Sequence, residues 1–99
     1  MDTPDAAPQF DVTENVDVGR FELRRNDELV GYADYLVQDG VIVVPHVETI
    51  AEHRGNGYAA RLMDGLLATI AADGRRIVPL CSFARGHVRD NPQHHHLLA

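Results

Sequence analysis

The sequence predicts a single α+β domain in which antiparallel strands precede one long amphipathic helix and a further strand. Three observations carry this prediction: the chain is short, its first half contains strand-like apolar runs, and its second half changes to a helical period. With 99 residues, of which 44% are hydrophobic, the chain can build one core and is too small for two. We therefore expect one domain with a single functional site.

The first half predicts three strands joined by short turns. Residues 21–23 alternate apolar and charged side chains, and Asn26-Asp27 marks a turn before a second run at 29–37. Asp39-Gly40 is typical of a tight hairpin turn, and the β-branched run that follows it at 41–44 predicts a more deeply buried strand. Together these elements indicate an antiparallel meander.

Pro45 follows the buried run directly and interrupts its pattern. Proline has no N–H to donate to a strand ladder and is normally confined to sheet edges or bulges. We expect a bulge at Pro45 or the loss of a partner strand there. Alternatively, the strand ends at Val44.

The segment from Gly57 to Asp73 has the spacing of an amphipathic helix. Leu62, Leu66 and Ile70 fall four residues apart, while charged side chains face the other way. We therefore predict a helix that lays its apolar side on the sheet.

The remaining elements follow this helix. Gly74 is typical of a helix C-terminal cap, and residues 77–80 predict a further strand, placed beside the earlier ones by a β–α–β crossover. Residues 83–90 predict a short C-terminal helix that stops before Asn91-Pro92, because the residue before a proline is disfavoured in a helix.

The ends and the cysteine content predict a compartment. Residues 1–10 are acidic and contain proline, so we expect a disordered tail before a domain at 11–99. The tail lacks the basic start and apolar stretch of a signal peptide, and no run approaches the ~20 apolar residues of a membrane span. Cys81 is the one cysteine, which excludes an internal disulfide. We expect a cytoplasmic protein that does not contact membranes.

The net charge bears on the partners. A formal charge of −6 repels phosphodiester backbones at long range, so nucleic acid is not expected as a partner. The same charge attracts a cationic amine.

A glycine-containing turn lies directly before the predicted helix. Gly55 and Gly57 are separated by one residue, which lets the backbone turn tightly and approach a ligand closely. The unpaired N–H groups of a helix's first turn and its dipole, about half a positive charge, favour an anion such as a diphosphate. Arg54 adds a full charge and Ala59 leaves room. Alternatively, the glycines only allow the positive φ angles of an ordinary loop. A Rossmann dinucleotide-binding turn is disfavoured, because its Gly-x-Gly-x-x-Gly pattern needs a glycine where this chain has Ala60.

Arg54, Gly57 and Ala59 match the cofactor signature of the GCN5-related N-acetyltransferase (GNAT) family: Gln or Arg, two variable residues, Gly, one variable residue, then Gly or Ala. The chain resembles the short, single-domain members of this family over roughly residues 21–92. The further matches are Gly31-Tyr32-Ala33, His46-Val47-Glu48, His53-Arg54-Gly55-Asn56-Gly57 and Pro79-Leu80-Cys81-Ser82-Phe83. The resemblance implies a minimal GNAT fold and acetyl-CoA-dependent transfer of an acetyl group to an amine.

The resemblance also implies where acetyl-CoA, the acyl donor, binds. The strand at 41–48 would lie along the pantetheine arm, and a main-chain N–H near Ile50 would stabilise the oxyanion. The residues implied for cofactor binding are Thr49, Ile50, Ala51, Arg54, Gly55, Asn56, Gly57, Tyr58 and Ala59. Because coenzyme A is polyanionic, we expect a local basic patch, for which the candidates are Arg54, Arg61, Arg75 and Arg76.

Three residues are candidates for catalysis. Glu48 is the first choice for general base, because many members of the superfamily use a carboxylate from the end of this strand. His46 lies two residues earlier, on the same face, and imidazole exchanges protons near neutral pH. Cys81 would lie near the thioester, as a nucleophile or as a proton donor to the leaving thiolate, or it is only a small buried hydrophobe. We expect direct transfer, without an acyl-enzyme.

Two further features limit these expectations. Members of the superfamily often use a tyrosine from the last helix as general acid. This sequence has His87 and no tyrosine in that segment, so the resemblance does not assign the general acid. We expect no metal site in the run His94-His95-His96, because consecutive histidines cannot all converge on one ion. The alternatives to an acetyltransferase are a catalytically weak acyl-CoA-binding or interaction module, since the chain is short, and a structural domain without a cofactor.

Overall fold

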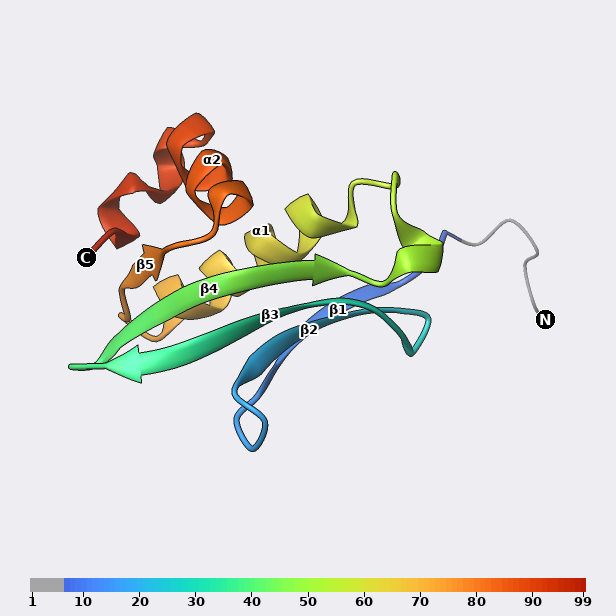
Figure 1. The fold of residues 1–99 in the computed structure, drawn as a ribbon, viewed down its shortest axis with the longest axis horizontal. Helices are drawn as coiled ribbons and strands as arrows, with labels where there is room; N and C mark the ends of the chain where they lie inside the picture. Colours follow the sequence, from blue (N-terminus) through green and yellow to red (C-terminus); the bar gives the residue numbers. More distant parts are fainter. Residues whose placement is uncertain (1–6) are drawn as a thin grey trace.

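The computed structural model of the chain describes residues 7–99, which form one five-stranded sheet with helices against it (Figure 1). The strands are β1 (Phe10–Asn15), β2 (Arg20–Arg25), β3 (Glu28–Gln38), β4 (Val41–Thr49) and β5 (Ile77–Pro79). The α-helices are α1 (Tyr58–Ala72) and α2 (Ser82–Asp90), and the 3₁₀ helices are η1 (Ala51–His53) and η2 (Pro92–Leu97). The α+β fold class is confirmed.

The strands lie in the order of the sequence, β1-β2-β3-β4-β5. The pairs from β1 to β4 are antiparallel, whereas β5 runs parallel to β4. The helix α1 supplies the crossover between those two strands and passes behind β4 in Figure 1. The meander, the crossover helix and the final strand were therefore all predicted correctly.

Left-handed backbone residues close two of the hairpins at the predicted turns. Asn26 and Asp27 have φ values of 48° and 69°, and Asp39 and Gly40 have 51° and 77°. Positive φ at both central residues matches the twist of the flanking strands. Asn, Asp and Gly tolerate this conformation best, which is why these dipeptides indicated turns.

The core lies between the sheet and the apolar side of α1. Leu62, Leu66 and Ile70 are fully buried, as their spacing predicted. Gly74, with φ 69°, follows the C-cap Asp73 in the left-handed conformation that ends many helices. The helix contacts β1 to β4, so its first residues are held at a fixed position beside the end of β4.

Three elements, β1, η1 and η2, and one boundary differ from the predictions. Residues 1–6 of the predicted tail lie outside the described residues, but Phe10 begins β1 and pairs with Arg25, so the tail does not extend to Phe10. The sequence contained a weak signal for β1, because Phe10 and Val12 alternate with polar residues. No expectation covered η2, whose first residue is Pro92.

The structure resolves the alternatives for Pro45. β4 continues to Thr49, so the alternative that the strand ends at Val44 is wrong. The register with β3 shifts between Asp34 and Leu36, opposite Pro45, and the pairing with β5 covers only Ile42 to Val44. Both expectations at Pro45, a bulge and the loss of a partner strand, are therefore confirmed.

In the part of the chain that the structure describes, no helix is long and apolar enough to cross a membrane.

Candidate functional site

Among residues 7–99, no strand lies beside the outer edge of β4 beyond Val44. Leu80 N–H donates to the Val44 carbonyl at 2.9 Å, and the chain then turns into α2 instead of continuing along β4. Ile50 N–H donates to Val30 O on β3 at 2.9 Å. Because N–H groups alternate between the two edges of a strand, those of Val47 and Thr49 face the open edge. An oxyanion donor is therefore available at Val47 or Thr49, whereas the N–H of Ile50 itself is already bonded.

The turn between η1 and α1 has the left-handed backbone that its glycines predicted. Gly55 and Gly57 have φ values of 86° and 73°, and Gly57 is the N-cap of α1. No side chain of the described residues caps this end, and the first turn of α1 holds no acidic residue. The N–H groups of the first helical turn have no intrahelical partner, so they are available to an anion. The Asn56 side chain instead donates to His53 O at 3.0 Å and braces the turn.

Three of the predicted site residues form one hydrogen-bonded chain. His46 Nε2 lies 2.9 Å from Glu48 Oε1, and Arg54 Nη2 donates to Glu48 Oε2 at 2.9 Å. Arg54 Nε also donates to Thr49 O, at 3.3 Å, which holds the guanidinium near the open edge of β4. The Arg54 guanidinium, and after it His46, lower the pKa of Glu48 from its usual value. The structure thus brings both candidate bases together with the predicted phosphate-binding arginine.

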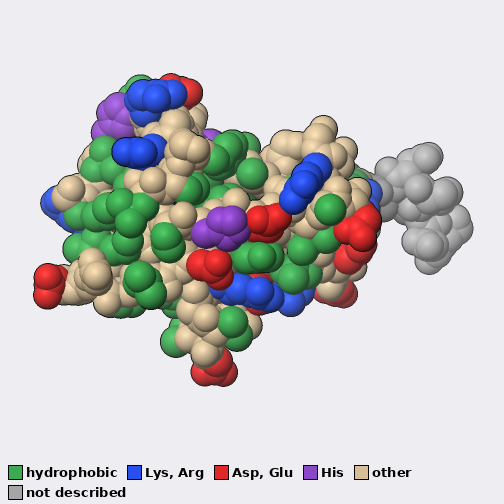
Figure 2. Space-filling view, viewed as in Figure 1, with side chains coloured by type: hydrophobic (Ala, Val, Ile, Leu, Met, Phe, Trp, Pro, Cys, Tyr) green, Lys and Arg blue, Asp and Glu red, His purple; other side chains and the backbone are tan. Residues whose placement is uncertain are grey.

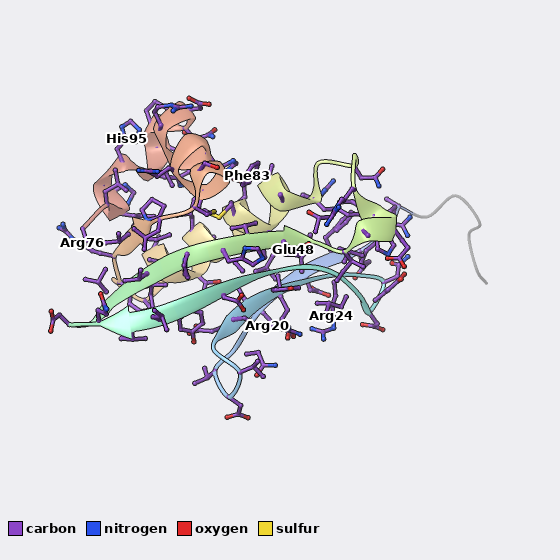
Figure 3. The ribbon with its side chains drawn as sticks, viewed as in Figure 1. Arg20, Arg24, Glu48, Arg76, Phe83 and His95 are labelled. Atoms are coloured by element: carbon purple, nitrogen blue, oxygen red, sulfur yellow. The ribbon has the colours of Figure 1, made fainter. Side chains whose placement is uncertain are left out.

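His46 and Glu48 project from the sheet face that is turned away from α1. Val47, between them, packs against the core, and successive side chains of a strand point to opposite faces. Their register partners on β3 are Asp34 and Tyr32. Figure 2 shows a histidine among acidic side chains near the middle of this face, and Figure 3 places Glu48 on β4 above the arginines of β2. The face is polar and suits an amine.

Cys81 lies where β5 gives way to α2. Its N–H approaches Val44 O at 3.4 Å, and its Sγ accepts a hydrogen bond from Ala84 N–H at 3.3 Å, so Cys81 caps α2. Its side chain is half-buried against the core. Cys81 therefore lies at the point where β4 and β5 separate, but among the described residues it has no hydrogen bond with Glu48 or His46.

A hollow of about 330 Å³ separates the start of α1 from α2. Phe83, whose exposed fraction is 43%, lines it and projects from the start of α2 in Figure 3. Its other lining residues are Ala60, Ser82, Gly86, His87, Asp90 and Asn91. A larger hollow, of about 660 Å³, is lined by none of the predicted site residues. The smaller one is also lined by none of them, but Ala60 lies in α1 only three residues after Gly57.

Two of the four arginines expected in a basic patch lie elsewhere. Arg75 pairs with Glu14 and Asp73 just beyond the C-terminal end of α1, and Arg76 donates to Leu98 O. A helix of 15 residues is about 22 Å long, so this end is far from the turn. Figure 3 shows the separation between Arg76 and Glu48. The expectation for these two arginines was wrong, because they follow the C-terminal end of α1 whereas the turn lies at its N-terminal end.

The other two arginines are at the correct end. Arg54 follows η1 directly, and Arg61, in the first turns of α1, places its guanidinium 3.9 Å from the centre of the Phe10 ring. Sequence reasoning missed the role of Phe10 as a support for Arg61, because the residue was placed in the tail. It also missed Val47, whose exposed N–H follows from strand alternation once the register is known.

Comparison with known proteins identifies the family of the chain and a solved structure of similar fold. A family model described as GCN5-related N-acetyl-transferase matches residues 20–97. A solved structure, of ribosomal-protein-alanine N-acetyltransferase from Brucella melitensis biovar Abortus 2308, is similar in fold with a TM-score of 0.52 and 22% identity. The match covers 73% of this chain and 59% of that one, so this chain spans less than two thirds of its length. No curated protein matches the chain. The chain belongs to the GCN5-related N-acetyltransferase family.

Proposed function

We propose that this domain binds acetyl-CoA at the open edge of β4 and the start of α1, and transfers the acetyl group directly to an amine. The observation that carries the proposal is the separation of β4 and β5 after Val44, beside a helix start that no side chain in the described part of the chain caps. The two features offer an extended thiol arm a free strand edge and offer a diphosphate a set of unpaired N–H groups.

The residues around the turn fit such a ligand. A Cβ built on Gly57 meets nothing within 4 Å, so the backbone there is open to a close approach. The Arg54 side chain is 63% exposed and free to turn from Glu48 toward a phosphate. The groups proposed to hold acetyl-CoA are the backbone of Val47 and of Thr49, Ile50 and Ala51 at the end of β4, and Arg54, Gly55, Asn56, Gly57, Tyr58 and Ala59 at the turn.

Acetyl-CoA supplies a thioester whose carbonyl carbon an amine can attack. In the proposed reaction the C–N bond forms, the amine loses a proton to His46 or Glu48, and the C–S bond breaks so that CoA leaves as a thiolate, which takes up a proton from solvent. A backbone N–H of Val47 or Thr49 donates to the acyl oxygen as negative charge develops on it. Arg54 lowers the pKa of Glu48 and so keeps it a weak base while the two are paired, and a phosphate that draws Arg54 away would strengthen it.

Isothermal titration of the purified chain with acetyl-CoA tests the binding step. Gly57→Glu should abolish binding while the chain stays folded, because the new carboxylate would occupy the place of the phosphate. Gly40→Glu is a matched control: it adds the same charge at a glycine with a similar φ, 77°, and equally open surroundings, in the turn between β3 and β4. Equal affinity of a folded Gly57→Glu variant and the wild type would refute the proposed site.

A second candidate function is an acyl-CoA-binding or interaction module with little catalysis. The polar face around Glu48 supports it, because among residues 7–99 no helix covers that side of β3 and β4. Few residues would then surround a bound acceptor amine and hold it in place. Acetyl-CoA binding without release of free CoA, in the presence of a panel of primary amines, would favour this module over the transferase.

A further inference from the structure

Two histidines and an aspartate from three separate elements converge on one point. Asp64 comes from α1, His87 from α2 and His94 from η2. Their ligand atoms all lie within 4.8 Å of one another. The run of three histidines gave no reason to expect this, since the partners of His94 are 7 and 30 positions away in the sequence and only the fold brings them together.

The atoms are arranged as ligands to one ion would be. Asp64 Oδ1 lies 2.7 Å from His87 Nε2 and 3.9 Å from His94 Nε2. Ligand atoms bound tetrahedrally to Zn²⁺ at about 2.0–2.1 Å are about 3.3 Å apart, a value between these two distances. Changing these two distances by about 0.6 Å, and bringing the two histidine nitrogens from within 4.8 Å to a similar separation, would therefore admit an ion.

The histidine rings are held in place before any ion binds. The side chains of His87 and His94 are only 11% and 17% exposed. The His87 ring lies between the rings of Phe83 and His94, with interplanar angles of 23° and 24°. The 3.9 Å between His94 Nε2 and Asp64 Oδ1 is too long for a hydrogen bond. The His94 ring makes no hydrogen bond with any of the described residues. The imidazole nitrogen of His94 nearest the cluster therefore has no hydrogen-bond partner among the described residues.

The link between α2 and η2 is also fixed. Asn91 Nδ2 donates to His87 O at 2.7 Å, and His94 N–H donates to Asn91 O at 3.0 Å. These bonds set the positions of the two histidine backbones relative to each other. Asp64 is 62% exposed, which leaves the cluster open to solvent on one side. An ion has an entry route, and water could complete its coordination.

We propose that Asp64, His87 and His94 form a binding site for a divalent transition-metal ion of the Zn²⁺ type. Two imidazoles and one carboxylate suit Zn²⁺, Ni²⁺ or Co²⁺, whereas Mg²⁺ and Ca²⁺ prefer oxygen ligands alone. The ion ties α1, α2 and η2 together, so it stabilises the helical end of the domain. This proposal does not depend on the proposed acetyltransferase activity.

The site is tested on metal-free protein that carries no polyhistidine tag. This protein is titrated with ZnCl₂. We expect one Zn²⁺ per chain, a higher Tm with Zn²⁺ present, and no comparable effect of MgCl₂, because an ion that binds only the folded state stabilises it. Co²⁺ should give the visible absorption of a four-coordinate ion. Asp64→Asn, His87→Gln and His94→Gln should each weaken Zn²⁺ binding at least tenfold.

His95→Gln and His96→Gln are matched controls from the same run. His95 Nε2 lies 3.2 Å from Arg89 O, outside the cluster, so both controls should bind Zn²⁺ like the wild type. Circular dichroism of each variant without metal establishes that it is folded. The proposal fails if the wild type binds no Zn²⁺, if the controls lose binding as much as His94→Gln does, or if folded Asp64→Asn and His87→Gln bind as tightly as the wild type.

Discussion

Arg54 and Glu48 form an ion pair in which Nη2 and Oε2 are 2.9 Å apart. The pair joins the proposed phosphate-binding turn to a proposed catalytic base. While Arg54 is bonded to Glu48, it is not available to a phosphate. While Arg54 is bonded to Glu48 it holds the pKa of that carboxyl below its usual value. A phosphate that attracts Arg54 would release the carboxylate and make it a stronger base. In the proposed function, cofactor binding would thereby be coupled to the base strength of Glu48.

Arg54→Ala should raise the pKa of Glu48 toward its usual range, with only the smaller effect of His46 remaining. Carboxyl-carbon NMR titration of the wild type and the variant measures the change. Arg61→Ala is the control, because Arg61 lies over Phe10 and not beside Glu48. Adding inorganic pyrophosphate to the wild type should shift the Glu48 pKa in the same direction as Arg54→Ala. An unchanged pKa in Arg54→Ala would show that the pair is not formed in solution.

The elements of the fold were largely predictable, because local signals determine them. Asp39-Gly40 indicated its hairpin, and the four-residue spacing from Leu62 to Ile70 indicated the buried side of α1. Residues whose environment depends on distant partners were not predictable. Glu22 looked like an exposed residue in an alternating strand, yet it is 4% exposed, because arginines on either side of it pair with its carboxylate.

In the candidate site, too, local features were predictable from the sequence and features that depend on distant residues were not. The turn at Gly55 and Gly57 has the predicted backbone, since positive φ is a local property of the chain. The pairing of Arg54 with Glu48 and the hydrogen bond of Ile50 N–H to β3 depend on register, which the sequence does not specify. The partners of His94 depend on how α2 and η2 fold back on α1, so the sequence predicted no cluster there.

Glu22→Gln should destabilise the domain by about 1–3 kcal/mol at neutral pH, because it removes a charged acceptor from buried hydrogen bonds. Arg24, then Arg20, lower the pKa of Glu22 from 4.5 to about 2. Because its pKa is lower in the folded state, Glu22 stabilises the fold at pH values above its unfolded-state pKa. This stabilisation is lost as the pH falls from about 4.5 to about 2. Urea unfolding across that range should show the two proteins converging in stability. Glu52→Gln, at an exposed position, should differ little from the wild type at any pH.

Gly65→Ala and Gly86→Ala should change stability in opposite directions, although both glycines lie inside helices. A Cβ on Gly65 would lie 2.6 Å from Val12 Cβ, so α1 would have to move away from β1, which costs about 1–3 kcal/mol. A Cβ on Gly86 meets only the flexible end of Arg89, at 3.4 Å. Alanine there should stabilise α2 by about 0.5–1 kcal/mol, because glycine is the poorer helix former. Thermal unfolding of both variants measures the signs, and a stabilised Gly65→Ala would contradict the close packing of α1 on β1.

Cys81→Ala decides between direct transfer and a covalent route. If the acetyl group passes directly to the amine, the variant should retain most of its activity, since Cys81 Sγ only caps α2 and packs against the core. Losing that cap costs stability of about 1 kcal/mol, which a thermal unfolding control detects. Cys81→Ser keeps a capping side chain, and it separates the structural effect from the chemical one.

Intact-mass spectrometry supplies the second half of this test. Wild-type protein mixed with acetyl-CoA, without an amine, should gain no acetyl group at Cys81 under direct transfer. In a covalent route the thiolate attacks the thioester carbonyl, CoA leaves with a proton, and the protein gains one acetyl group until an amine removes it. We expect direct transfer, because the open edge of β4 and the turn at Gly57 already hold the thioester for attack in the proposed complex. An acetyl adduct that forms rapidly, is absent from Cys81→Ala and is discharged by an amine would establish the covalent route instead.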